Sequence, residues 1–228
     1  MEFPVWYPGE DDIPYLRHFA PHFPHVFIAL NAFTDVSSYV PKNDLESEFF
    51  LATDSVGAEC VVTWRRVANL CGFKSIARVN RALRGTGSGR IRSNLGSQSD
   101  TRHLMEVCEA NLIAPPYEGH FSPGTTRQIA KFLTALGHLE IIGDDWVFGG
   151  KLSRELVEGL FAASVRSEPR FYTVDHSLIV TMYIDYHYAL VCQTEDSRQK
   201  ANPADFFEGF DADETTNDYW GIGVNADA

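Results

Sequence analysis

The distribution of charge along the chain constrains its folding more than any other feature. Residues 60–99 contain eight arginine and lysine residues and no aspartate or glutamate. The whole chain of 228 residues has a formal net charge of −12, so the residues outside this block carry −20. A block of one sign in a chain of the opposite sign indicates an anionic partner, which is either the protein's own acidic surface or another molecule.

The composition is that of a folded protein without a membrane segment. With 44% hydrophobic and 13% aromatic residues, the chain can bury a sizeable core, and we expect one compact domain over residues 1–228. The longest apolar runs, such as residues 26–30, are too short to cross a bilayer, and the N-terminus lacks a signal-peptide pattern. Four cysteines stand far apart without a Cys-x-x-Cys pair, which favours reduced thiols. We therefore expect a cytoplasmic protein that does not bind membranes.

The residue patterns predict an α+β fold with a helical middle, built as a helix-turn-helix or a winged helix, and a C-terminal antiparallel β region. Four sub-regions follow: an N-terminal arm and strand (1–59), the helix-turn-helix or winged-helix-like part (60–150), a helix with the β region (151–200), and an acidic tail (201–228). Within them, we expect a strand over residues 25–33, a β region over 171–192 formed by a strand or a hairpin, and a hairpin with its turn at 143–145. We expect a short helix within residues 41–54 and helices at 101–113 (capped by Asp100), 123–136 and 153–163.

The basic block contains the signals of two short helices joined by a tight turn. Thr63 and Ser75 are residues that cap helices, and Gly72 can adopt the left-handed conformation that ends one. We expect the apolar residues of the two helices to face the protein interior. They are Trp64, Val67, Ala68, Cys71, Val79, Ala82 and Leu83. The following stretch, residues 85–92, is rich in glycine and contains further arginines, so we expect a flexible basic loop.

The pattern Val67-Ala68-x-x-Cys71-Gly72-Phe73-x-Ser75-x-x-x-Val79-x-Arg81-x-Leu83-Arg84 resembles the helix-turn-helix of AraC-type bacterial regulators. The match is confined to residues 63–84, so it implies a local shape rather than membership of that family. It implies that the second helix lies in the major groove of duplex DNA while the first crosses the backbone. The residues then expected to contact nucleic acid are Arg65, Arg66, Lys74, Arg78, Asn80, Arg81, Arg84, Arg90 and Arg92.

The acidic tail supports a different interpretation. Residues 201–228 contain seven acids and no lysine or arginine. The tail is either a solvated end or an acidic and aromatic surface that binds a basic protein, as small bacterial immunity proteins bind nuclease toxins. The residues of that partner-binding surface would be Phe206, Phe207, Asp211, Asp213, Glu214, Tyr219 and Trp220.

Candidate sites for chemistry are weaker than these two surfaces. His18, His22 and His25 have the spacing of one helical face, but Pro21 and Pro24 interrupt any such helix, so we expect no metal site. Asp185 and His187 would share one face of a strand, as an acid–histidine pair that tunes a base does. No nucleophile elbow accompanies them, and no motif indicates a cofactor.

We therefore expect a non-enzymatic protein that binds a macromolecule, with duplex DNA as the first candidate partner. An acidic inhibitor of a basic protein is the alternative. A small hydrolase-like enzyme is the second alternative.

Overall fold

The computed structural model describes residue 8 and the ranges 12–38, 60–86, 96–145, 151–158 and 170–221. The short helix that the sequence predicts at residues 41–54 lies outside these ranges, as do Arg90 and Arg92 of the glycine-rich loop.

The centre of the protein is a seven-stranded antiparallel sheet with the strand order β10-β1-β9-β8-β7-β5-β6. Its strands are β1 (His25–Leu30), β5 (Glu140–Asp145), β6 (Lys151–Leu156), β7 (Arg170–Thr173), β8 (Leu178–Thr181), β9 (Tyr188–Gln193) and β10 (Gly209–Asp211). All residues of β8 and β9 are buried, as are five of the six in β1. A strand covered on both faces reads as a continuous apolar run, which is why these segments show little alternation.

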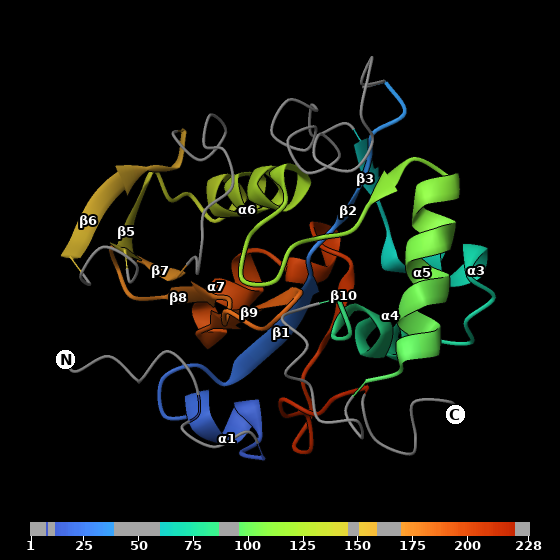
Figure 1. Ribbon diagram of the computed structural model, residues 1–228. Coiled ribbons are helices and arrows are strands. Elements are labelled where there is room, and N and C mark those ends of the chain that lie inside the picture. Colours follow the sequence, from blue (N-terminus) through green and yellow to red (C-terminus); the bar gives the residue numbers. More distant parts are fainter. Residues whose placement is uncertain are drawn as a thin grey trace.

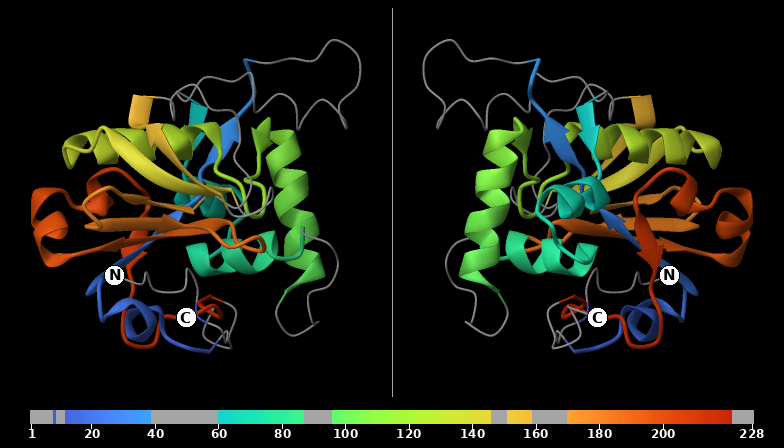
Figure 2. Two further views of the ribbon diagram at one scale, coloured as in Figure 1. Left: turned by 90° about the vertical axis from the view of Figure 1, so that its left-hand side faces the viewer. Right: turned by 90° about the vertical axis from the view of Figure 1, so that its right-hand side faces the viewer.

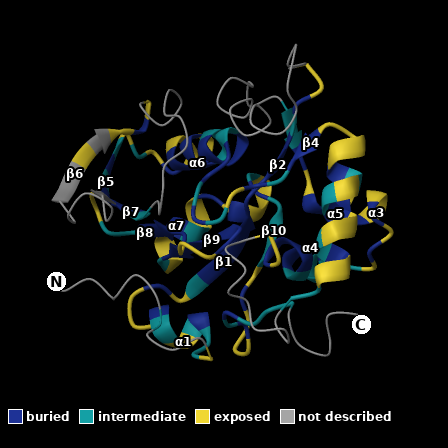
Figure 3. Ribbon diagram, in the orientation of Figure 1, coloured by how far each residue is buried: buried dark blue, intermediate teal, exposed yellow. Residues whose placement is uncertain are grey.

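Helices cover both faces of this sheet. Figure 2 shows α6 (Pro123–Ala135) along one side of the sheet and α1 (Tyr15–Phe19) on the other. α7 (Glu195–Lys200) and a short 3-10 helix (Pro203–Asp205) follow β9 and lead into β10. Buried residues concentrate in the central strands and on the helix faces turned toward them (Figure 3).

A second layer stands at one end of the sheet (Figure 1). It consists of a three-stranded sheet and a helical unit of three helices. The small sheet has the order β3-β2-β4, with β2 (Phe33–Asp35), β3 (Val61–Val62) and β4 (Ile113–Ala114). The helical unit is formed by α3 (Trp64–Leu70), α4 (Ile76–Leu83) and α5 (Gln98–Ala110).

Side-chain caps define where these helices begin. The hydroxyls of Thr63, Ser75 and Ser122 accept hydrogen bonds from the main-chain N–H three residues ahead, at α3, α4 and α6. The α5 helix is capped by Ser97 rather than by Asp100, which the sequence favoured. The Asp100 carboxylate lies inside the first turn and binds an arginine instead.

One predicted helix is wrong. Residues 153–156 of the expected 153–163 helix belong to strand β6, which pairs with β5 along its whole length, and residues 159–163 lie outside the described ranges. Pairing with a neighbouring strand outweighs the local apolar spacing, because cross-strand contacts largely decide strand formation.

The hairpin and the C-terminal β region also differ in detail from the expectation. β5 continues through residues 143–145, where the turn was predicted, and Asp145 is opposite Lys151. Because β5 also pairs with β7, the hairpin belongs to the central sheet and is not the wing of a winged helix. The predicted β region over residues 171–192 contains β7, β8 and β9, but residues 182–187 form a loop between β8 and β9.

Two glycines with the same backbone conformation differ in their surroundings, and this difference gives a stability prediction. Gly72 and Gly119 both have φ of +65°, and a Cβ atom on Gly72 would meet nothing within 4 Å. On Gly119 it would lie 2.8 Å from the Ile184 main chain. We expect Gly72→Ala to lower the free energy of unfolding by about 1–2 kcal/mol. Gly119→Ala should cost about 1–3 kcal/mol more, because of the clash. Urea denaturation of both variants measures this, and equal losses would contradict it.

Candidate functional site

The exposed cations among the described residues of the basic block lie near the two ends of α3. Arg65 and Arg66 are in its first turn, and Lys74 follows the glycine turn at its other end. All three side chains are exposed, and none of them forms an ion pair with another described residue. Arg102 on α5 is also exposed, and it was missed because it lies outside the acid-free block of the sequence. We call Arg65, Arg66, Lys74 and Arg102 the basic helical face.

The N-terminus of α3 is already occupied by the protein's own carboxylate. The main-chain N–H groups of Trp64 and Arg65 donate to the two oxygens of Glu208, at 2.5 and 2.9 Å. A helix N-terminus attracts anions because its N–H groups are unpaired and carry the positive end of the helix dipole. Glu208 satisfies these groups, so the anion-binding capacity of this region resides in the arginine and lysine side chains.

Arg78 on α4 is committed to a neighbouring helix. Its Nε and Nη2 donate to the two carboxylate oxygens of Asp100 at 3.1 and 3.0 Å, and its guanidinium lies 4.8 Å from the centre of the Phe73 ring. The hydrogen bond from Arg78 holds the pKa of Asp100 below its usual value. This two-point pairing ties α4 to α5, so Arg78 is only partly available to a ligand.

The expectation that α4 exposes Asn80 and Arg84 is wrong. Asn80 has 0% and Arg84 8% of its surface exposed. Asn80 Nδ2 donates to the main-chain oxygen of Trp220 at 3.0 Å. Arg84 Nη2 donates to Asp218, at 2.6 Å to its main-chain oxygen and 2.9 Å to its Oδ1. The residues near the C-terminus therefore cover the side of α4 that carries Asn80 and Arg84.

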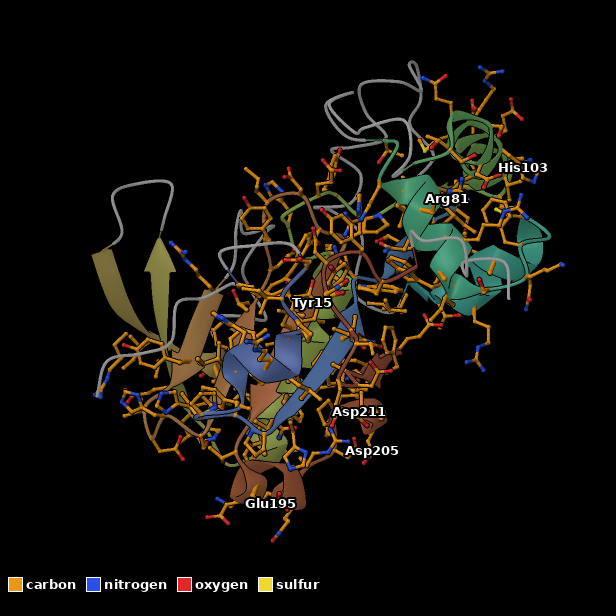
Figure 4. All side chains as sticks on the ribbon, turned by 90° about the horizontal axis from the view of Figure 1, so that it is seen from below. Tyr15, Arg81, His103, Glu195, Asp205 and Asp211 are labelled. Carbon is orange, nitrogen blue, oxygen red and sulfur yellow. The ribbon has the colours of Figure 1, made fainter. Side chains whose placement is uncertain are left out.

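Arg81 is the remaining described arginine of α4, and it is half-buried. Figure 4 shows Arg81 and His103 together in the helical unit, well separated from the acidic Glu195, Asp205 and Asp211. The part of the helical unit that carries Arg81 is therefore separate from these three carboxylates.

Arg84 is part of a buried polar cluster that joins four segments. The hydroxyls of Tyr15 and Tyr188 are 2.8 Å apart, and Tyr188 donates to Asp218 Oδ1 at 3.5 Å. Burial raises the pKa of Tyr188, so it stays a neutral donor. Burial and the charge of Arg84 lower the pKa of His187 to about 3, so its ring is neutral near pH 7. The cluster connects α1, α4, β9 and the segment around Asp218.

The predicted pairing of Asp185 with His187 on one strand face is wrong. Both residues belong to the loop between β8 and β9, where Asp185 is exposed and His187 is buried. A different carboxyl is perturbed here, since burial and the charge of Asp185 raise the pKa of Glu118 to about 7. Sequence reasoning missed Glu118, because the loops that carry the two carboxyls are far apart in the chain.

The acidic tail does not form one exposed partner-binding surface. Phe207 is buried, and Phe206 and Trp220 pack against the core. Tyr219 is half-buried, while the carboxylates of Asp211, Asp213 and Glu214 are exposed. Asp211 pairs with Arg198 at 2.9 Å, and Asp213 accepts hydrogen bonds from Thr215 and Thr216. The aromatic side chains therefore anchor the tail to the core. The pairing of β10 with β1 attaches the tail to the central sheet as well.

The three N-terminal histidines do not form a metal-binding group with other described residues. His25 Nε2 pairs with Glu195 at 2.7 Å, across the start of β1 and α7. Over the described ranges, no group of three or more histidine, cysteine or carboxylate side chains has the arrangement of a metal site. None of the helices in the same part of the chain combines the length and the hydropathy that crossing a bilayer requires.

Comparison with known proteins identifies the family. A family described as "Protein of unknown function (DUF2711)" matches residues 11–222. The chain belongs to the DUF2711 family. A search of curated proteins and a search of solved structures found no match. The DUF2711 range includes both sheets, the helical unit and Asp218.

The buried ion pair gives the second stability prediction. Asp218→Ala leaves the buried Arg84 guanidinium without its carboxylate partner, and we expect it to lower the free energy of unfolding by about 3–5 kcal/mol. Asp100→Ala is the control, because its partner Arg78 keeps 32% of its side chain exposed. We expect that variant to cost about 1 kcal/mol, since water can solvate the released cation. Denaturant titration compares the two, and similar losses would show that the Arg84 pair is not special.

Proposed function

We propose that the protein binds a polyanionic macromolecule, with duplex DNA as the first candidate, through the basic helical face. The observation that carries this proposal is the exposure of Arg65, Arg66 and Lys74 without ion pairs among the described residues, in a chain of net charge −12. In a strongly acidic chain, exposed cations gathered on one helical unit favour an external anionic partner.

The contacts expected are with phosphates rather than with bases. Base readout from α4 in a major groove needs exposed side chains, whereas Asn80 and Arg84 are buried and Arg78 is bonded to Asp100. Arginine and lysine side chains that contact phosphate position a protein on a duplex without reading its sequence. Arg65 and Arg66 are in the first turn of α3, and Lys74 follows the glycine turn after its last residue, Leu70. Cations at two separate positions allow contacts with more than one phosphate.

The acidic remainder of the chain also affects binding. Figure 4 shows Glu195, Asp205 and Asp211 on a side away from the helical unit that carries Arg81. A duplex bound to the helical unit on the side of Arg81 therefore avoids these three carboxylates. Their long-range repulsion weakens the complex most at low ionic strength, where screening is smallest.

The salt dependence of DNA binding tests this proposal. We expect the affinity for a mixed-sequence 20-base-pair duplex to fall with salt, with a log–log slope of roughly −2 to −3 for three phosphate contacts. Arg65→Glu/Arg66→Glu/Lys74→Glu should abolish binding, because three attractive contacts become repulsive. The matched control is Arg127→Glu/Lys131→Glu/Lys200→Glu, which makes the same change of charge on α6 and α7. Fluorescence anisotropy of the labelled duplex gives the affinities.

Two results would contradict the proposal. One is the absence of DNA binding by the wild-type protein at 50 mM salt. The other is an equal loss of affinity in the two triple variants, because net charge alone would then account for binding. Thermal melts of all three proteins, measured first, ensure that each variant is folded.

A further inference from the structure

Two loops that lie against each other beside the Arg84–Asp218 pair each carry a tyrosine and a carboxylate. One loop connects β4 to α6 and carries Tyr117 and Glu118; the other connects β8 to β9 and carries Tyr183, Ile184 and Asp185. We call these five residues the tyrosine–carboxylate platform. The loops are in direct contact, since the N–H of Gly119 donates to the carbonyl of Tyr186 at 2.9 Å.

Main-chain packing and hydrogen bonds from Asn31 hold the platform in place. Gly119 lies so close to Ile184 that an added Cβ would be 2.8 Å from its main chain, so the loops cannot approach further. Asn31, at the end of β1, donates to the His120 carbonyl at 2.6 Å and accepts from the Ser122 N–H at 2.9 Å. A surface fixed before binding loses little conformational entropy when a partner docks.

The aromatic part of the platform is exposed yet supported by the core. Tyr117, Tyr183 and Ile184 have 36%, 44% and 48% of their surface exposed. The Tyr183 ring packs 5.3 Å from Tyr186, which stacks on the buried Tyr188 at 4.7 Å. A shallow hollow adjoins Tyr117 and is lined mainly by prolines and aromatic rings. Exposed tyrosines on a rigid support are typical of protein interfaces.

Among the described residues, neither carboxyl forms an ion pair of its own. The charges that act on Glu118 are those of Asp185, which repels its ionised form, and of Arg84, which attracts it. Arg84 is already bonded to Asp218. Burial and Asp185 together raise the pKa of Glu118 to about 7, so the ionised carboxylate gains from any cation that approaches.

We infer that the tyrosine–carboxylate platform is a docking surface for a basic segment of a protein partner, with an arginine or lysine side chain seated against the tyrosine rings and the two carboxylates. Charge complementarity identifies the occupant, because carboxylates attract a guanidinium or an ammonium group and repel phosphates. The tyrosine faces add cation–π attraction and apolar contact with the side-chain stem. This surface is independent of the basic helical face.

The probe for the test is an end-capped tetra-arginine peptide, titrated calorimetrically into the full-length protein at constant ionic strength. We expect Glu118→Gln/Asp185→Asn to weaken binding by about tenfold or more. The matched control Glu106→Gln/Glu109→Gln removes the same two charges from the exposed side of α5. It should change the affinity less than about twofold, since its carboxylates are screened by solvent. Thermal melts exclude unfolding as the cause of any loss.

Tyrosine variants separate cation–π recognition from simple charge attraction. Tyr183→Ala should weaken peptide binding by about fivefold, because the exposed ring is lost. Tyr183→Phe should bind as the wild type does, since it retains the ring face. A Tyr183→Ala variant with unchanged affinity would overturn the role of the aromatic surface.

Binding should also strengthen as pH rises through 7. With a pKa near 7, the ionised fraction of Glu118 rises about tenfold between pH 6 and pH 8, and the affinity should rise by up to the same factor. The groups facing Glu118 are Asp185 and Arg84, and the neighbouring His187 stays neutral throughout. His120, in the same loop, donates from Nδ1 to the Glu118 carbonyl. Glu118→Gln should remove this part of the pH dependence.

Three outcomes would overturn the inference. If Glu118→Gln/Asp185→Asn binds the peptide as tightly as the wild type, the platform is not the site. If the Glu106→Gln/Glu109→Gln control loses as much affinity, general negative charge holds the peptide. If the wild-type protein forms a dimer in analytical ultracentrifugation that Glu118→Gln/Asp185→Asn dissociates, the occupant is a second copy of this chain and not another protein.

Discussion

The arrangement of this protein depends on the buried ion pair between Arg84 and Asp218. A guanidinium loses its hydration when it is buried, and the loss is offset only when a carboxylate and further hydrogen bonds replace the water. Asp218 supplies both a carboxylate oxygen and a carbonyl oxygen to Arg84, and Tyr188 donates to the same carboxylate. The segment around Asp218 must therefore close over α4, which joins the helical unit to the central sheet.

Internal ion pairs divide the basic block into two groups of residues. Arg78 and Arg84 are neutralised by the protein's own Asp100 and Asp218, while Arg65, Arg66 and Lys74 remain exposed. The internal acidic partner therefore accounts for Arg78 and Arg84, and the external partner that we propose concerns the other three residues. The division is the reason why we propose contacts with a phosphate backbone and not base readout by α4.

The tyrosine–carboxylate platform arises from the same packing. Glu118 is half-buried because its loop lies against the loop between β8 and β9, and the nearest arginine is engaged with Asp218. The acidic tail that the sequence suggested as a partner surface has another role, since it pairs with β1, caps α3 through Glu208 and covers α4. A surface for a basic partner is therefore inferred in the two loops instead.

Local chemistry along the chain determined the caps at Thr63, Ser75 and Ser122, because each cap bond joins residues only three apart. Apolar β-branched and aromatic runs likewise determined β1 and most of the β region over residues 171–192. Tertiary structure alone decided that residues 151–156 pair as a strand, that Arg84 is buried and that Glu118 meets Asp185. The Arg84–Asp218 contact joins residues 134 positions apart. No local pattern reports such a contact, because its energy depends on the surroundings that both groups acquire only when the chain has folded.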